Sequence, residues 1–424
     1  MYEFFKGAEF FNFELTRILS ASPYGGCDVA EFLDALDTIK PNHAQSWQQA
    51  WTKQAEKVER LANDALSTGH TKLARGAFLR ASNYFRASQY MLFERELSLR
   101  ILERSIANFQ LAMGMFDYPV ESVEIAHDGL MLPGMLYLPN QKQRVSEKVP
   151  LIIVCGGADS TKEELHFLIG ASGPSNGYAM LLFDGPGQGI SLLRDKTVQR
   201  PDWEAVIESV LDYIVAFADA HPSVALDMDR IAITGASMGG YYALRGATDI
   251  RIKACVAIDA FYDLFDLVMV RQPKMFMALW LGGWIPDRVI DTLTQLQGRL
   301  DFQSKWEVWC SSTILGTEKP SDLMRKTKEF TLRLPDGSEL LDAVTCPVLV
   351  SGAAHSLYFK PELSCGKIVE CLHNIEECKK EVWVPEEPAD GGLQAKVGAW
   401  ALMQYRTFKF LDKHFDIDRC EVSR

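Results

Sequence analysis

The chain has 424 residues, which is long for one domain, so the length predicts one domain with a sizeable appended part. Hydrophobic residues make up 47% of the sequence, enough to bury a large core. The net charge of −12 and the lack of any basic cluster argue against binding to nucleic acid or to an anionic membrane surface.

Nine cysteines are scattered along the chain without CxxC pairs or other metal-ligand spacing. This pattern predicts reduced, mostly buried thiols and no metal site. The N-terminal segment carries acidic residues and no apolar stretch ending in small residues, so no signal peptide is expected. The longest apolar run, 275–286, is too short to span a bilayer. We therefore expect a cytoplasmic protein.

Residues 1–115 have the pattern of helices. Apolar residues recur at helical spacing from Trp47 to Ala65, Gly69-His70 interrupts the run, and a second helix follows over about 71–91. The two helices resemble a single tetratricopeptide-like hairpin, and no repeat of it follows. Because one hairpin cannot stand alone, we expect this region to pack on the rest of the chain.

An α/β pattern begins near residue 120 and predicts a second unit over 116–424. Two apolar stretches flank the turn signal Asp128-Gly129 and predict an antiparallel hairpin. Short apolar strands then alternate with helical stretches. These strands are expected at 151–154, 180–183, 231–234, 254–258, 348–351 and 382–384. The alternation predicts a mostly parallel sheet with helices on both faces.

The alternation lapses over about 264–340, a stretch rich in Met, Trp and Leu between two expected strands. We interpret it as a partly helical insertion that forms a lid, and we expect most of its aromatic residues to be core. Together with residues 1–115 it should roof an apolar pocket for a small-molecule substrate.

The segment 235–240, GASMGG, follows an apolar strand and precedes a helical stretch. This is the context of a nucleophile elbow, which presents a serine hydroxyl at the edge of a sheet. Ser237 is therefore the candidate nucleophile. The backbone N–H of Met238 should point at the same space and help to hold an oxyanion.

A second oxyanion donor is expected in the loop after the 151–154 strand, which reads CGGADSTKEE over 155–164. Its glycines allow close approach of a substrate, and the backbone N–H near Gly157 is the candidate donor. Ser160 or Thr161 should cap the next helix with Glu163 or Glu164, a structural role.

The segment 184–189, DGPGQG, superficially resembles a dinucleotide-binding loop. A proline lies inside it and no helix opens directly behind it, so a turn at the rim of the pocket is favoured. We expect no cofactor.

Together these motifs resemble one branch of the α/β hydrolases, which includes the fermentation–respiration switch protein, 2,6-dihydroxypseudooxynicotine hydrolase and fungal heptaketide hydrolases. The resemblance covers nearly the whole chain. It is carried by the Trp47/Trp51 region, 156–164, 184–189, the elbow through Tyr242, 330–332 and 346–350. The opening, 10–15, and the chain length are most similar to members from fungal secondary-metabolite clusters.

The resemblance implies the α/β-hydrolase fold with a helical N-terminal region and a lid, a homodimer, and a Ser-His-Asp triad. The known hydrolases of the family cleave carbon–carbon bonds next to ketones. The substrate implied here is a lipophilic ketone of polyketide type.

Two positions depart from the family pattern. The family's acid, after the seventh strand, aligns near His355, and its histidine aligns within 392–394, where this chain has none. A serine needs a base, so the triad is degenerate.

Three interpretations remain open. The enzyme hydrolyses its substrate or cleaves a C–C bond, with His355 as a displaced base helped by Asp259 or Asp263. Alternatively, the pocket runs a non-hydrolytic condensation, cyclisation or isomerisation, or it binds a small molecule without turnover.

Overall fold

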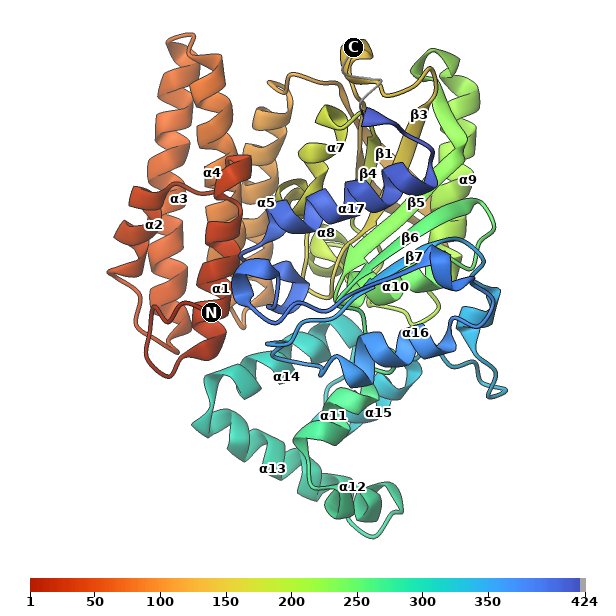
Figure 1. The fold of residues 1–424 in the computed structure, drawn as a ribbon. Coiled ribbons are helices and arrows are strands. Elements are labelled where there is room, and N and C mark those ends of the chain that lie inside the picture. Colours follow the sequence, from red (N-terminus) through yellow and green to blue (C-terminus); the bar gives the residue numbers. More distant parts are fainter. Residues whose placement is uncertain (420–424) are drawn as a thin grey trace.

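An eight-stranded, mostly parallel sheet forms the centre of the computed structural model, which describes residues 1–419 (Figure 1). The strands are β1 (Val120–His127), β2 (Leu130–Tyr137), β3 (Val149–Cys155), β4 (Ala179–Phe183), β5 (Leu226–Ala236), β6 (Ile252–Ile258), β7 (Val348–Ser351) and β8 (Lys380–Trp383). Their order in the sheet is β1-β2-β4-β3-β5-β6-β7-β8. β2 is antiparallel to β1 and β4, and all other neighbours are parallel. The α/β fold class expected from the strand–helix alternation is confirmed.

Each central strand faces two separate cores, because successive side chains point to opposite faces of a sheet. On β3, Ile152 and Val154 join a core that contains the N-terminal helices and α17 (Trp400–His414). Leu151 and Ile153 join the core on the other face, with α9 (Glu204–Ala220) and α10 (Met238–Gly246). Burial on both faces explains why these strands are continuously apolar.

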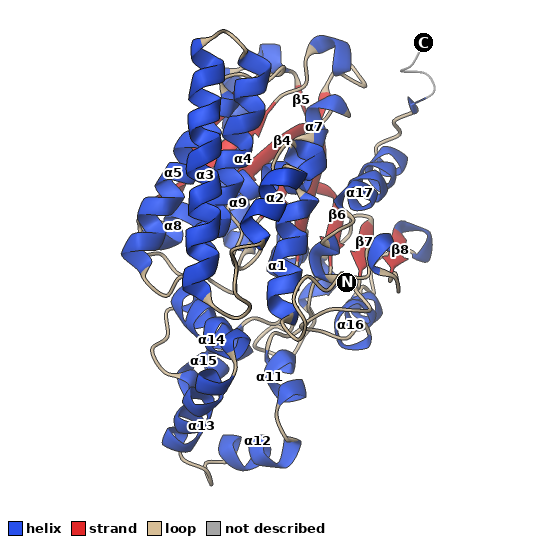
Figure 2. Ribbon diagram, turned by 90° about the vertical axis from the view of Figure 1, so that its left-hand side faces the viewer, coloured by secondary structure: helices blue, strands red, loops and turns tan. Residues whose placement is uncertain are grey.

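The N-terminal region forms five helices before the sheet begins. They are α1 (Glu9–Ser20), α2 (Val29–Leu36), α3 (Ala44–Ser67), α4 (Thr71–Tyr90) and α5 (Arg95–Met113). The long helices α3 and α4 stand side by side (Figure 2). Trp47 and Trp51 are fully buried between α3 and its neighbours, and they belong to the same core cluster as side chains of the sheet.

The insertion between β6 and β7 consists of five further helices that project beyond the sheet (Figure 1). They are α11 (Phe265–Arg271), α12 (Lys274–Leu281), α13 (Asp287–Leu300), α14 (Phe302–Leu315) and α15 (Pro320–Lys326). Trp306 of α14 packs in a tilted arrangement against Phe10 of α1 and Tyr90 of α4, with ring centroids 4.9 and 4.7 Å away. The insertion is therefore anchored on the N-terminal helices.

The shorter remaining helices are α6 (Lys162–Leu165), α7 (Ser172–Ser175), α8 (Gly189–Leu193) and α16 (Lys367–Cys371). Within residues 1–419, no helix is long and apolar enough to cross a membrane. The cysteines in this part of the chain are free thiols and most are buried, as predicted.

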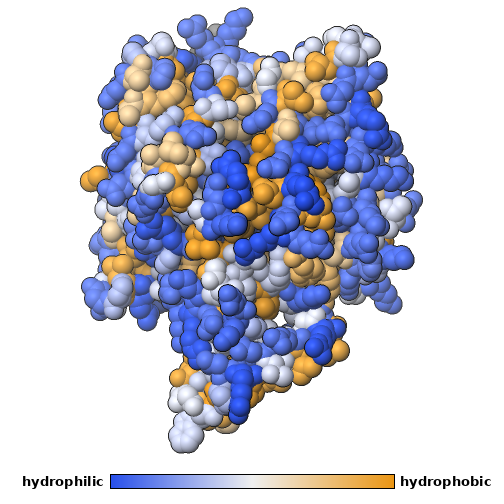
Figure 3. Space-filling view, turned by 180° about the vertical axis from the view of Figure 1, so that it is seen from behind, coloured by the Kyte–Doolittle hydropathy of each residue, from blue (hydrophilic) through white to orange (hydrophobic). Residues whose placement is uncertain are grey.

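The surface mixes polar and apolar residues, and the projecting insertion carries apolar side chains near its tip (Figure 3). Trp280 and Trp306 are buried, but Trp284 is 82% exposed. We expected most aromatic residues of the insertion to be core; Trp280 and Trp306 meet this expectation, and Trp284 does not.

Candidate active site

Ser237 lies on a sharp turn between the end of β5 and the start of α10. Its backbone adopts φ 57° and ψ −120°, a conformation that costs a non-glycine residue free energy. The Ser237 N–H donates to the Ile258 carbonyl at 2.8 Å, which fixes the turn on β6. A Cβ at Gly239 would lie 2.3 Å from the Cys155 carbonyl oxygen, so only glycine permits this approach of α10 to β3. The residues predicted for the elbow thus build one.

The two candidate oxyanion donors lie beside Ser237. Met238 is the first residue of α10, and the first N–H groups of a helix have no intrahelical partner. A Cβ on Gly157 would lie 3.3 Å from the Ala236 carbonyl oxygen, so the two backbones nearly touch. Ser237, Met238 and Gly157 all line one cavity.

Gln188 holds the Gly157 loop, a role that sequence reasoning missed. Its buried Nε2 donates to the Gly156 carbonyl at 2.7 Å and to the Gly157 carbonyl at 3.0 Å. In a trans peptide the C=O and N–H groups point in opposite directions. Because Gln188 binds the Gly156 carbonyl, the Gly157 N–H points away from Gln188.

The segment 184–189 does not form the rim of the pocket, and that prediction was wrong. None of its residues lines the cavity. Asp184 is buried and accepts hydrogen bonds from the backbone N–H groups of Lys162 and Ile190, at 2.7 and 3.3 Å. The segment is a buried support that ties the start of α6 to β4.

The cavity has a volume of about 310 Å³ and is roofed from two sides. Phe13 of α1 and Tyr90 of α4 line it from the N-terminal region, and the insertion contributes residues of α11, α13, α14 and α15. Much of the wall is apolar. The apolar lining includes Leu165, Leu168, Phe261, Leu264, Leu267, Val268, Trp306, Val308, Ile314, Leu315, Leu323, Phe359 and Trp400. Such walls suit a lipophilic ligand.

His355 does not reach this cavity. Its side chain is exposed and is not among the residues that line the cavity. Its backbone N–H donates to the Gly392 carbonyl at 2.8 Å in a short parallel bridge with Leu393. The expectation that this side chain faces the pocket because it follows β7 is therefore not met, since the bridge fixes the loop with His355 outward.

None of the eight histidines, all within the described residues, lines the cavity. The most buried is His166, which stacks on Phe116, and burial lowers the pKa of its imidazole to about 3. It is therefore a neutral core residue.

Gln394 lies in the 392–394 segment, where the family resemblance led us to expect the position of a catalytic histidine. Its side chain lines the cavity, donates to the Asp259 carbonyl at 3.1 Å and accepts from the Ser356 hydroxyl at 2.6 Å. A carboxamide is not a base near neutral pH. Gln394 therefore supplies no base to the cavity.

The two predicted helper carboxylates also have other partners. Asp259 is buried outside the cavity lining, where its Oδ1 lies 2.8 Å from Lys396 Nζ and accepts from the Ser351 hydroxyl at 2.8 Å. Asp263 accepts from the N–H of Phe265, the first residue of α11, at 2.8 Å, and burial raises the pKa of its carboxyl. Neither aspartate joins Ser237 in the cavity.

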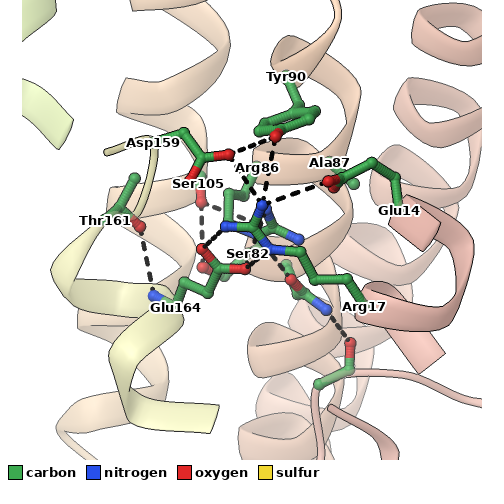
Figure 4. Close-up of polar contacts among 12 residues, drawn as sticks. Glu14, Arg17, Ser82, Arg86, Ala87, Tyr90, Ser105, Asp159, Thr161 and Glu164 are labelled. Atoms are coloured by element: carbon green, nitrogen blue, oxygen red, sulfur yellow. Dashed lines mark hydrogen bonds and ion pairs between the residues drawn. The ribbon is translucent and has the colours of Figure 1, made fainter. Parts of the chain in front are cut away.

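A charged cluster lies at the cavity instead (Figure 4), and all of its members except Arg86 line the wall. Its members come from α1, α4 and the β3–α6 segment, and they are Glu14, Arg17, Arg86, Tyr90, Asp159 and Glu164. Arg17 binds Glu164 through two hydrogen bonds of 2.6 Å and Asp159 through one of 3.0 Å. Thr161 caps α6, as predicted, but Glu164 faces this cluster rather than completing a purely structural capping box.

Comparisons with known proteins identify the family to which this fold belongs. The model of the "Alpha/beta hydrolase family" matches residues 151–366. The chain belongs to the α/β hydrolase family. An "Alpha/beta hydrolase xenA" of Xenoacremonium sinensis is 47% identical, over 97% of this chain and 98% of that protein. The "Hydrolyase poxO" of Penicillium oxalicum is 44% identical, over 99% of this chain and 100% of its own length.

Among solved structures, the 2,6-dihydroxy-pseudo-oxynicotine hydrolase matches with a TM-score of 0.69 and 20% identity, over 95% of this chain and 96% of that one. The structure titled "AbyA5 Wildtype" matches with a TM-score of 0.65 and 16% identity, over 99% and 98% of the two chains. Both matches extend over nearly the whole of this chain. At these identities the likeness concerns the fold alone.

Proposed function

We propose that this α/β hydrolase-fold enzyme acts on a lipophilic ketone of polyketide-type secondary metabolism, by a non-hydrolytic condensation, cyclisation or isomerisation. The single observation that carries the proposal is that Ser237 lines a cavity that no histidine lines, with Gln394 at the family's histidine position. A serine without a base is a weak nucleophile. The oxyanion donors beside it need no base to work.

Magnitudes favour this choice over hydrolysis. Loss of the histidine from a serine-protease triad costs about a millionfold in kcat. A single oxyanion-hole donor contributes about a hundred- to a thousandfold. No histidine lines this cavity, so the larger contribution to hydrolysis is absent. The backbone donors that could stabilise an enolate are proposed to remain.

The ketone oxygen is proposed to lie between the N–H groups of Gly157 and Met238, with the Ser237 hydroxyl as a third donor. The apolar wall then surrounds the rest of the substrate. The class of substrate follows from the family resemblance and from relatives that are fungal proteins of the same length.

Hydrolysis or C–C bond cleavage stays as a second candidate, because some relatives carry hydrolase names and the elbow geometry is intact. A fluorophosphonate probe separates the two. The first proposal predicts little or no labelling of the wild-type protein, compared with a competent serine hydrolase. Stoichiometric labelling that Ser237→Ala abolishes would instead establish an activated nucleophile.

Proton exchange separates catalysis from mere binding. Apolar ketones with slow spontaneous exchange, such as 4-phenylbutan-2-one, are incubated with the protein in D₂O. The wild-type protein should replace the hydrogens next to the carbonyl with deuterium faster than buffer does, as followed by proton NMR. A Ser237→Ala variant should be about a hundredfold slower, as for loss of one oxyanion donor.

A further inference from the structure

The charged cluster contains one carboxyl more than its guanidinium groups can neutralise. Arg17 and Arg86 face three carboxyls, those of Glu14, Asp159 and Glu164. If all three were ionised, one negative charge would remain uncompensated in a buried site, which is costly.

Two of the three carboxyls are firmly held. Glu164 receives both hydrogen bonds of the Arg17 fork and lies 3.2 Å from Arg86 Nη1. Asp159 accepts from Arg17 and from the Tyr90 hydroxyl. Although burial acts in the opposite direction, Arg17 and Tyr90 hold the pKa of Asp159 below its usual value.

Glu14 is the loosely held member. Its Oε1 lies 3.5 Å from Arg17 Nη1, and within residues 1–419 its side chain makes no hydrogen bond. The side chain is only 3% exposed, yet the residue lines the cavity. The titratable and charged groups around it from the neighbouring elements are Arg17, Arg86, Tyr90, Asp159, Glu164, Cys310 and Tyr358.

We propose that Glu14 is the acid–base residue of the Ser237 cavity, where it moves a proton to and from the carbon next to a ketone; this role rests on the proposed function. The geometry offers Glu14 for this task because it lines the cavity without a hydrogen-bonding partner that would have to be displaced. Glu164 is less suited, because both of its oxygens accept from Arg17. Asp159 is less suited because its Oδ2 accepts from both Arg17 and the Tyr90 hydroxyl, which favour the ionised carboxylate.

The step is an enolisation. The Glu14 carboxylate takes a proton from the carbon next to the carbonyl, and the electron pair of the broken C–H bond forms the C=C bond of an enolate. The carbonyl π pair moves to oxygen, where the N–H groups of Gly157 and Met238 stabilise it. Glu14 then returns its proton to the same carbon, to a conjugated one, or to the alkoxide formed when the enolate attacks a second carbonyl of the same molecule. No co-reactant is consumed.

The acidity of Glu14 suits both directions of this transfer. Burial, opposed by Arg17, raises the pKa of Glu14 from 4.5 to about 7. A group whose pKa lies near the working pH is the most effective acid–base catalyst.

The test compares Glu14→Gln, which keeps the shape and removes the titration, with Glu9→Gln, the same change at an exposed site one turn earlier on α1. Exchange of 4-phenylbutan-2-one in D₂O should fall about a hundredfold or more in Glu14→Gln and stay unchanged in Glu9→Gln. The wild-type rate should rise with pH through about 7 and then level off. Independently of activity, the infrared difference between wild type and Glu14→Gln should contain a protonated-carboxyl band that disappears over the same range.

The outcomes separate the two proposals. If the wild type exchanges protons and Glu14→Gln exchanges them equally fast with the same pH profile, Glu14 is structural and the inference fails while the proposed function stands. If Glu14→Gln does not fold, a wild-type rate without an inflection near pH 7 overturns the inference in its place. If the wild type does not exceed the buffer rate with any ketone, the proposed function falls and the role of Glu14 with it.

Discussion

The ammonium group of Lys396 lies 2.8 Å from Oδ1 of Asp259, and both side chains are almost completely buried behind the Ser237 cavity. Lys396 also donates to the Gly352 carbonyl at 2.8 Å. The pair therefore ties the loops after β6 and β7 to the 392–397 segment that carries Gln394. Asp259 is thereby committed to a structural ion pair.

Replacement of Lys396 by methionine should be strongly destabilising, because it leaves the Asp259 carboxylate buried without its counter-charge. Loss of one partner of a buried pair costs about 3–5 kcal/mol. The free energy of unfolding in urea measures this. Lys57→Met, which breaks the exposed pair with Asp34, is the matched control and should have a much smaller effect.

The double variant Lys396→Met/Asp259→Asn checks the cause. Removing the second charge as well should restore part of the stability lost in Lys396→Met. If the free energy lost in the double variant equals the sum of the losses in Lys396→Met and Asp259→Asn, the two residues are not coupled as an ion pair.

His355→Ala should retain wild-type activity, because the side chain is exposed and lies outside the cavity lining. Ketone exchange at several pH values measures this, with Ser237→Ala as the variant expected to lose activity. A tenfold or larger loss in His355→Ala, with a changed pH profile, would mean that the loop turns inward during turnover and that the displaced-base interpretation was right.

The raised pKa of Glu14 also predicts a pH dependence of stability. A carboxyl with a pKa of 4.5 when unfolded and about 7 when folded binds more protons in the native state between these values. Stability from this group is therefore present at low pH and is lost as pH rises from about 4.5 to 7, by about 3 kcal/mol.

Glu14→Gln removes this dependence. Relative to wild type, the variant should gain stability as pH rises from 5 to 8 by up to that amount. Urea unfolding of both proteins at matched pH values gives the difference, and Glu9→Gln should show none. A constant difference between wild type and Glu14→Gln would mean that Glu14 is ionised throughout.

The parts of this molecule that were predictable from sequence are those fixed by short segments. The elbow needs a strand, a tight turn with glycines beside Ser237, and a helix, and all three lie within one run of residues. The alternation of strands and helices is likewise local. The mostly parallel sheet and the helical character of residues 1–115 therefore agree with expectation.

The charged cluster could not be predicted from local sequence, because its members come from three segments that are distant in the chain. Asp159 and Glu164 belong to the 155–164 segment, which the capping of α6 by Thr161 already explains. Nothing in that segment indicates that both carboxylates bind Arg17. The one local signal was Glu14 and Arg17, one helical turn apart among buried apolar residues of α1. Charges on the buried face of a helix indicate partners elsewhere.

The direction of His355 was unpredictable for a related reason. A loop position after a strand does not determine which way its side chain points, because the backbone pairing with Leu393 decides this. Asp263 had a short-range explanation that was overlooked, since it lies just before α11 and accepts from the first N–H of that helix.

Gln188 offers a last prediction, because it positions the oxyanion loop without lining the cavity. Its side chain bonds the carbonyls of Gly156 and Gly157 and accepts from the Gly185 N–H at 3.0 Å. Gln188→Leu leaves these buried groups unpaired, each at about 1–3 kcal/mol. The Gly157 N–H is then no longer held in place, so ketone exchange should fall by up to about a hundredfold.

The kinetic signature distinguishes positioning from substrate binding. If Gln188 acts through the Gly157 N–H, kcat should fall in Gln188→Leu while KM changes little, because the donor matters most when charge develops on the ketone oxygen. Gln141→Leu, the same change at an exposed position, should alter neither constant. A raised KM with unchanged kcat would instead mean that the loop only shapes the pocket, and the oxyanion role of Gly157 would have to be abandoned.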